Sequence, residues 1–202
     1  TGPVASTVFS SPLLRARQTL VEARAVLESD GPVLSERDTV TLPELREIDL
    51  YEWQGRTQPE VGASDPDMLR LWKERAWELQ LGEGRYVVRD LWDRAATAWR
   101  LMRESVGDGA TAERPALIVA HGTLGKALLS TATGLPPQAF RHFSLKNGEV
   151  VEVAWPKDMG ASSEDGALWR RRHPEEGAWR SSADEQTSFS SNDALQGSVD
   201  VA

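Results

Sequence analysis

The spacing of apolar and polar side chains divides most of the chain into alternating strands and helices. Ala116–Ala120 is apolar at every position, which predicts a central parallel strand buried on both faces. Shorter apolar runs predict three more strands, at Thr7–Ser10, Thr39–Leu42 and Val150–Trp155. Because helical segments separate these strands, the order of elements favours an α/β layered domain.

Helical spacing of apolar residues is most regular from Val88 to Met102, which predicts an amphipathic helix. Ser11 as N-cap and Pro12 as the first helical residue predict another helix, which runs to about Leu27. Helices are also expected at 67–81, 125–133 and 138–143, and a polar loop, broken by prolines and a glycine, at 58–67.

The composition changes at Lys157, after which Ser, Asp, Glu and Gly dominate the sequence. Such a segment buries too little apolar surface to fold, so we predict one domain at residues 1–156 and a disordered tail at 157–202. The expected fold class is α/β, with three layers in which helices flank a parallel sheet. Ligands of such sheets bind beyond the carboxyl ends of the strands.

Charge and composition exclude several classes of function. The net charge of −8 does not suit a nucleic-acid binder, because duplex binding depends on many contacts from cations to phosphates. The chain has no cysteine, which excludes disulfides, thiolate catalysis and cysteine zinc sites. The three histidines lack metal-ligand spacing, and no apolar run is long enough to span a membrane. We therefore expect no metal, no cofactor, no nucleic-acid partner and no membrane partner.

Polar residues stand at the carboxyl ends of two predicted strands. His121 and Gly122 follow the strand Ala116–Ala120, where a histidine lies near a helix N-terminus that attracts anions. Arg15 lies in the first turn of the helix that starts at Ser11, where the helix dipole disfavours a cation, so an anionic partner is indicated. A core or capping histidine and a solvated arginine are the alternatives.

An acidic cluster lies between the two regions, at Glu44, Glu47, Asp49 and Glu52. A carboxyl group next to a bound dianion keeps its proton more readily and can act as a general acid. A solvated acidic loop is the alternative interpretation. His142 and His173 have no supporting context, and we interpret both as structural or exposed.

Three segments resemble, in the same order, the motifs of the histidine phosphatase superfamily of phosphoglycerate-mutase-like proteins. Phe9–Thr19 resembles its "S-S-P-x-x-R-A-x-Q-T" segment, Leu45–Gly55 its acidic "L-x-E-…-G" segment, and Ile118–Gly122 its second-histidine segment. The resemblance covers about residues 5 to 156. It implies a phosphoglycerate-mutase-like sheet flanked by helices, and hydrolysis of a small phosphorylated metabolite through a phosphohistidine.

The resemblance also implies a role for each matching residue. Arg15 and Gly122 would bind the phosphoryl group, Glu47 would give a proton to the leaving oxygen, and His121 would hydrogen-bond the phosphoryl oxygens. These residue types suit the reaction, because phosphoryl transfer is catalysed mainly by positioning and by neutralisation of charge.

Parts of the sequence are similar in particular to the plant and algal 2-carboxy-D-arabinitol-1-phosphatase group. The matching stretches are Leu45–Tyr51, Val88–Trp92 and Ala127–Leu135. This narrower resemblance implies a sugar-phosphate substrate, such as 2-carboxy-D-arabinitol 1-phosphate, and a location in the chloroplast stroma. Without it, a cytoplasmic location is expected.

The chain departs from the superfamily pattern at its start. The family begins with a strand that ends in Arg-His-Gly and carries the phosphorylated histidine, and no residue before Thr7 matches it. We therefore interpret the chain, which begins at Thr1, as a fragment that lacks the first strand and does not turn over phosphomonoesters. The alternatives are a pseudophosphatase that binds without turnover and a phosphoglycerate mutase, whose long basic insertions this sequence does not have.

Overall fold

The computed structural model describes residues 7–30, 39–107, 115–154, 168–171, 180, 184, 185 and 189. The chain forms two compact units. The first unit comprises Thr1–Glu47 and Arg94–Gly125, and the second comprises Ile48–Asp93 and Lys126–Ala202.

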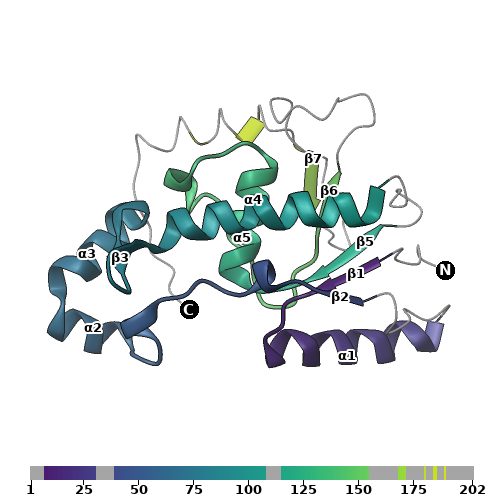
Figure 1. Ribbon diagram of the computed structural model, residues 1–202, viewed down its shortest axis with the longest axis horizontal. Helices are drawn as coiled ribbons and strands as arrows, with labels where there is room; N and C mark the ends of the chain where they lie inside the picture. Colours follow the sequence, from purple (N-terminus) through teal and green to yellow (C-terminus); the bar gives the residue numbers. More distant parts are fainter. Residues whose placement is uncertain are drawn as a thin grey trace. The chain divides into compact units, whose positions relative to one another are not determined.

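The first unit contains a parallel sheet of three strands (Figure 1). Its order is β2 (Thr39–Thr41), β1 (Thr7–Ser10), β5 (Ala116–Val119), so the predicted strands at these positions are confirmed. Helix α1 (Leu14–Asp30) packs against β1 and β5. Its Leu20 forms a small apolar core with Val8, joined by half-buried side chains from β5.

The prediction that Ala116–Ala120 forms a central strand buried on both faces is wrong for the part of the chain that the structure describes. Strand β5 lies at the edge of the three-stranded sheet and is half-buried at all four positions. The central strand is β1, whose Val8 and Phe9 are completely buried. A continuous apolar run signals a strand but does not say how many neighbours the strand has.

Helix α1 begins at Leu14, two residues after the predicted start at Pro12. Ser11 still belongs to the sheet, because its N–H donates to the carbonyl of Val119 at 3.0 Å. The Ser11 hydroxyl accepts the N–H of Leu13 at 3.3 Å and thereby stabilises the turn into the helix. The chain therefore changes from strand to helix over three residues, and Arg15 stays in the first turn of α1.

Two longer helices contain residues of both units. Helix α4 (Val87–Val106) confirms the amphipathic prediction, with Val88, Leu91 and Ala95 all buried. Helix α5 (Gly122–Ala132) begins three residues earlier than predicted, directly after His121.

The second unit begins with two helices where the sequence predicted a loop followed by one helix. These helices are α2 (Gln58–Ser64) and α3 (Pro66–Arg75). The loop prediction for 58–67 is wrong because each proline stands at a helix start, where its missing N–H is tolerated. In addition, Thr57 and Glu60 form a capping box at the start of α2.

Short elements complete the chain. The helix predicted at 138–143 is a single 3₁₀ turn, and the end of the one predicted at 67–81 is replaced by a 3₁₀ turn and a strand. The 3₁₀ turns are η2 (Pro43–Leu45), η3 (Tyr51–Trp53), η4 (Ala76–Glu78) and η6 (Pro137–Ala139), and the hairpin strands are β3 (Gln80–Leu81) and β4 (Arg85–Tyr86).

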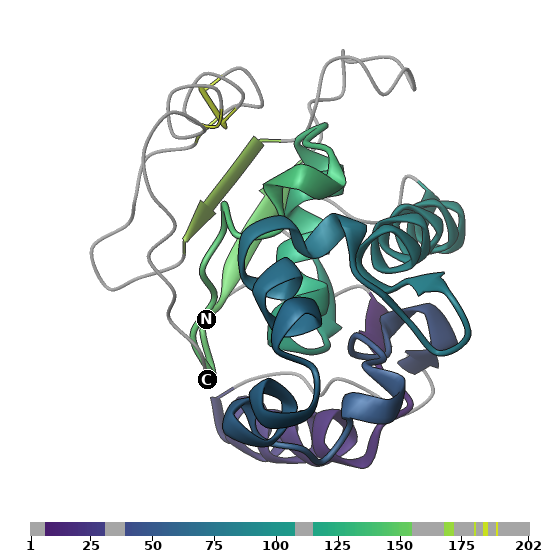
Figure 2. The same ribbon diagram turned by 90° about the vertical axis from the view of Figure 1, so that its left-hand side faces the viewer.

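An antiparallel pair of strands ends the second unit, β6 (Val151–Ala154) and β7 (Leu168–Arg171) (Figure 2). Strand β6 confirms the strand predicted at Val150–Trp155. Strand β7 lies within 157–202, where the composition predicted no regular structure, so these four residues differ from the expectation. The proposed domain boundary at residue 156 stays a prediction.

The core of the second unit is rich in aromatic side chains. The rings of Trp72 and Phe140 lie 5.1 Å apart and those of Trp92 and Phe140 6.2 Å apart, between centroids. The buried indole of Trp92 donates its N–H to the carbonyl of Leu135 at 3.0 Å. This hydrogen bond satisfies the indole nitrogen of Trp92 where it is buried.

Candidate active site

All four residues singled out by the sequence, Arg15, Glu47, His121 and Gly122, lie in the first unit, and the side chains of Arg15 and His121 are in direct contact. Strands β1 and β5 are parallel, and Ser10 at the end of one lies opposite Val119 at the end of the other. The segments that follow both strands therefore leave the sheet at the same edge. Arg15 lies in the first turn after β1 and His121 follows β5, and their side chains are hydrogen-bonded.

His121 makes two side-chain contacts. The Nε–H of Arg15 donates to its Nδ1 at 3.2 Å, and its Nε2 lies 2.8 Å from the hydroxyl oxygen of Ser11. Burial lowers the pKa of His121 below its ordinary value, and the charges of Arg15 and Arg94 lower it further, while the carboxylate of Glu47 opposes them. The imidazole is therefore neutral at neutral pH.

Glu47 lies at the N-terminus of α5. Its carboxylate accepts the N–H of Thr123 at 3.1 Å and the N–H of Leu124 at 2.9 Å. These amides begin the helix and carry the positive end of its dipole, which is where an anion binds most favourably. The position expected for a ligand anion is thus held by a carboxylate of the chain itself.

Arg94 is a residue of this site that the sequence analysis did not single out. Its guanidinium donates to the backbone carbonyl of Glu47 at 3.0 Å. It lies in α4, far from the three motifs, and no spacing or motif in the sequence connects it to them. Its contact fixes the backbone from which the Glu47 carboxylate reaches α5.

Gly122 is the first residue of α5 and is exposed. Apart from its own neighbours along the chain, no atom of the described residues lies within 4 Å of the place where a side-chain Cβ would be. The backbone at Gly122 therefore has open space beside it, and its role in substrate binding stays a prediction.

The rest of the acidic cluster has structural roles. In the second unit, the carboxylate of Asp49 accepts the N–H of Tyr51 at 2.9 Å and the side-chain amide of Gln54 at 2.7 Å. Glu52 accepts the N–H of Gly82 at 2.9 Å.

Of the other two histidines, the structure describes His142 but not His173. His142 is buried in the second unit, where its Nε2 contacts the carboxylate of Glu185, which confirms a structural role. His173 lies outside the described residues.

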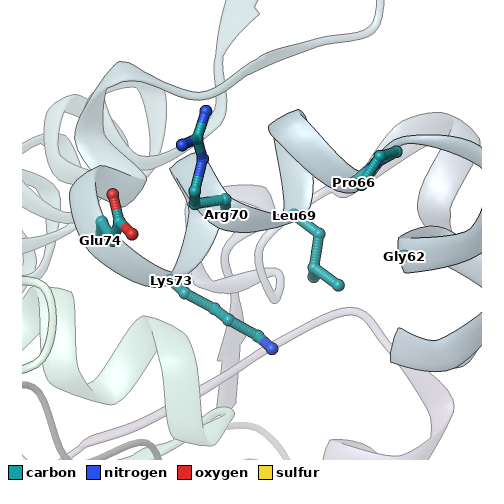
Figure 3. A pocket seen from close by; sticks show the side chains of 6 residues that line it. All are labelled: Gly62, Pro66, Leu69, Arg70, Lys73 and Glu74. Atoms are coloured by element: carbon teal, nitrogen blue, oxygen red, sulfur yellow. The ribbon is translucent and has the colours of Figure 1, made fainter.

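A cavity of about 340 Å³ lies in the second unit between α2 and α3 (Figure 3). Its lining includes Leu69, Lys73 and Glu74, together with Arg70, which is paired with Asp67 at 3.0 Å. The charges of both signs give this cavity no net preference for an anion. None of the predicted site residues lines it.

Within the described ranges, no group of three or more His, Asp or Glu side chains has the geometry to hold a metal ion. None of the helices in the same ranges is long and apolar enough to cross a membrane.

Known proteins share both the sequence and the fold. The 2-carboxy-D-arabinitol-1-phosphatase of Triticum aestivum is 32% identical over 133 residues, which are 66% of this chain and 24% of that protein. The glucosyl-3-phosphoglycerate phosphatase of Mycolicibacterium vanbaalenii is 36% identical over 162 residues, which are 79% of this chain and 65% of that protein. The chain thus spans about a quarter of the plant relative and under two thirds of the mycobacterial one.

Solved structures of mycobacterial proteins match the fold, a parallel sheet flanked by helices, and confirm the predicted fold class. Mycobacterial hydrolase 1 superposes with a TM-score of 0.62 at 26% identity, covering 86% of this chain and 78% of that one. The complex of mycobacterial glucosyl-3-phosphoglycerate phosphatase with VO3 has a TM-score of 0.61, also at 26% identity, covering 84% and 76%. The model of the histidine phosphatase superfamily (branch 1) matches residues 3–164. With its motifs, fold and relatives in agreement, this chain belongs to the histidine phosphatase superfamily.

Proposed function

We propose that the chain provides the phosphate-binding part of a phosphomonoesterase. The observation that carries this proposal is the 3.2 Å hydrogen bond between Arg15 and His121, two residues far apart in sequence, in one unit with the start of α5. Both side chains can donate hydrogen bonds to phosphoryl oxygens, and the planar fork of an arginine suits two of them at once.

In the proposed reaction the site residues divide the work. Arg15 and the open backbone at Gly122 bind the phosphoryl group, and His121 hydrogen-bonds its oxygens. Glu47 gives the leaving oxygen its proton. To do so, its carboxyl group leaves the amides of Thr123 and Leu124, which can then bind the anion in its place.

The nucleophile in this proposal is a histidine that residues 1–202 do not supply. Both ring nitrogens of His121 are engaged, and His142 is buried with Glu185 in the second unit. In the described part of the chain, β5 pairs with β1 along one edge only. A strand that ends in Arg-His-Gly can add along the other edge of β5 and bring its histidine to the carboxyl end of the sheet.

The proposed substrate is a small phosphorylated sugar or sugar acid. Both relatives are named for such compounds, 2-carboxy-D-arabinitol 1-phosphate in wheat and glucosyl-3-phosphoglycerate in the mycobacterium. Comparing turnover of these two compounds by a protein that includes the missing strand decides between them. The chloroplast stroma, expected with the plant substrate, stays a prediction.

The first experiment measures binding of orthovanadate to the 202-residue chain by calorimetry. We expect binding that Arg15→Ala abolishes and that Arg17→Ala, an exposed arginine two residues away in α1, leaves unchanged. Equal binding by both variants would contradict the proposed site.

The second experiment measures hydrolysis of an aryl phosphate. We expect no turnover by this chain, and several orders of magnitude less turnover for Arg15→Ala or His121→Ala in a protein that includes the Arg-His-Gly strand. Turnover by the 202-residue chain that His121→Ala abolishes would overturn the proposal that the nucleophile lies elsewhere. Binding without turnover even with the strand present would favour a pseudophosphatase.

A further inference from the structure

His121 is held between a cation and a hydroxyl group. Arginine has hydrogen-bond donors but no acceptor, so the Nδ1 that receives the Nε–H of Arg15 at 3.2 Å carries no proton. The hydrogen of the neutral ring is then on Nε2. Since Nε2 lies 2.8 Å from the Ser11 hydroxyl oxygen, it donates to that oxygen.

This polarity is opposite to that of a nucleophilic serine. In a serine–histidine pair that attacks a substrate, the ring accepts the hydroxyl proton, and a carboxylate on the far side of the ring stabilises the resulting charge. Here the far side of His121 faces the guanidinium of Arg15, and Ser11 is completely buried. Ser11 therefore neither attacks nor contacts a substrate.

The position of Ser11 is fixed by the sheet. Its N–H donates to the carbonyl of Val119 at 3.0 Å, so it continues the pairing of β1 with β5. Its hydroxyl oxygen also accepts the N–H of Leu13 at 3.3 Å. The oxygen that contacts His121 is thus held from both the sheet and the start of α1.

We propose that Ser11 is a positioning residue, which holds Nε2 of His121 inward so that Nδ1 is the nitrogen that faces a bound anion. A hydroxyl group both donates and accepts, so Ser11 stays bonded to Nε2 whichever nitrogen carries the proton. In the empty site Nδ1 accepts from Arg15. When an anion draws Arg15 away, Nδ1 takes up a proton from solvent, and the ring becomes an imidazolium that donates from Nδ1 to the anion and from Nε2 to Ser11. This inference rests on the proposed function for the identity of the anion, but the contact with Ser11 can be tested without it.

The test uses nitrogen and proton NMR of the 202-residue chain with labelled histidine. In the unligated wild-type chain we expect His121 to carry its proton on Nε2, with slow exchange because its acceptor is completely buried. In Ser11→Ala that proton exchanges faster and its resonance shifts. Ser10→Ala, which removes a neighbouring buried hydroxyl that bonds to the backbone instead, leaves the resonance unchanged. Ser11→Thr retains a hydroxyl group and should restore the slow exchange and the wild-type resonance of the Nε2 proton.

Sulfate then serves as a probe of the anion site. We expect its addition to place a proton on Nδ1 in the wild-type chain, and Ser11→Ala to weaken its binding roughly tenfold, the loss expected for one hydrogen bond. A proton on Nδ1 in the unligated wild-type chain would overturn the proposal, and this measurement does not need the Ser11→Ala variant to fold. An Nε2 resonance that Ser11→Ala leaves unchanged would also overturn it. If Arg15→Ala leaves the affinity for sulfate unchanged, the proposed function is contradicted, but the positioning role of Ser11 is not.

Discussion

His121 in the first unit and His142 in the second differ in the charge of the side chain that each contacts, and this difference gives them different roles. His121 is half-buried and receives a hydrogen bond from the cation Arg15. His142, whose side chain is 7% exposed, contacts the carboxylate of Glu185, and its ring meets Phe143 edge-on at 4.8 Å between centroids. The first histidine is disposed to respond to an incoming anion, since burial and the charges of Arg15 and Arg94 oppose its protonation against the carboxylate of Glu47. The second satisfies a buried carboxylate and so supports the fold.

The largest expected effect is a loss of stability when the contact between His142 and Glu185 is removed. His142→Ala removes one partner of the Glu185 carboxylate, which is 2% exposed and also contacts Arg180 at 2.9 Å, and should lower the free energy of unfolding by roughly 3 kcal/mol. His121→Ala should lower it by less than about 1 kcal/mol, because that ring is half-buried and bears no buried charge. Urea denaturation of both variants measures the difference. Equal decreases in the free energy of unfolding would mean that the two histidines contribute equally to stability.

A smaller effect is expected from a pair of glycines, one in each unit. Gly82 has a φ of +53°, and a Cβ there would lie 2.4 Å from the ring of Tyr51. Gly82→Ala should therefore destabilise the protein by about 2 kcal/mol. Gly122→Ala, with nothing near its Cβ, should change stability by less than about 0.5 kcal/mol. Thermal unfolding of the two variants tests this, and a larger loss for Gly122→Ala would show that the start of α5 is crowded.

Much of this architecture follows from local patterns. Helix α4 was predicted because apolar residues recur along one face from Val88 to Met102, about four turns, a signal that tertiary contacts rarely override. The meeting of Arg15 and His121 was predicted because parallel strands end at the same edge of a sheet. Both inferences depend on properties that neighbouring residues share.

The errors concern what depends on distant residues. The run Ala116–Ala120 does not reveal that β5 has one described neighbour, and the prolines in 58–67 read as loop residues although they begin helices α2 and α3. The contact of Ser11 with His121 joins positions 110 residues apart, and that of Arg94 with Glu47 joins positions 47 apart. No local pattern encodes such contacts.

The smallest expected effect sharpens the comparison through the titration of His121. Arg15→Gln removes a cation that lowers the pKa of His121, so the pKa should rise toward its ordinary value, whereas Arg17→Gln should not change it. NMR titration of the ring proton measures both. A pKa of His121 unchanged by Arg15→Gln would mean that the charge of Arg15 does not contribute to lowering it.

The same lowered pKa predicts how stability depends on pH. Below about pH 6.5 the unfolded chain takes up a proton that the folded His121 does not, so this residue's contribution favours folding above that pH and is lost as the pH falls. Arg15→Gln, which raises the pKa of the folded His121 toward that of the unfolded chain, should narrow the pH range over which this contribution to stability is lost. Urea midpoints measured across this range, compared with those of Arg17→Gln, test the sign.

The register of β1 with β5 has a consequence for how the molecule is made. Phe9 pairs with Ile118, so the central strand leaves the ribosome long before the partner that completes its sheet. Closing so long a loop is slow, since its entropy is lost before the pairing is gained. A nascent chain that stops short of Val119 can have neither the sheet nor the anion site. The ability to bind an anion is therefore acquired only after β5 has been synthesised and has paired with β1.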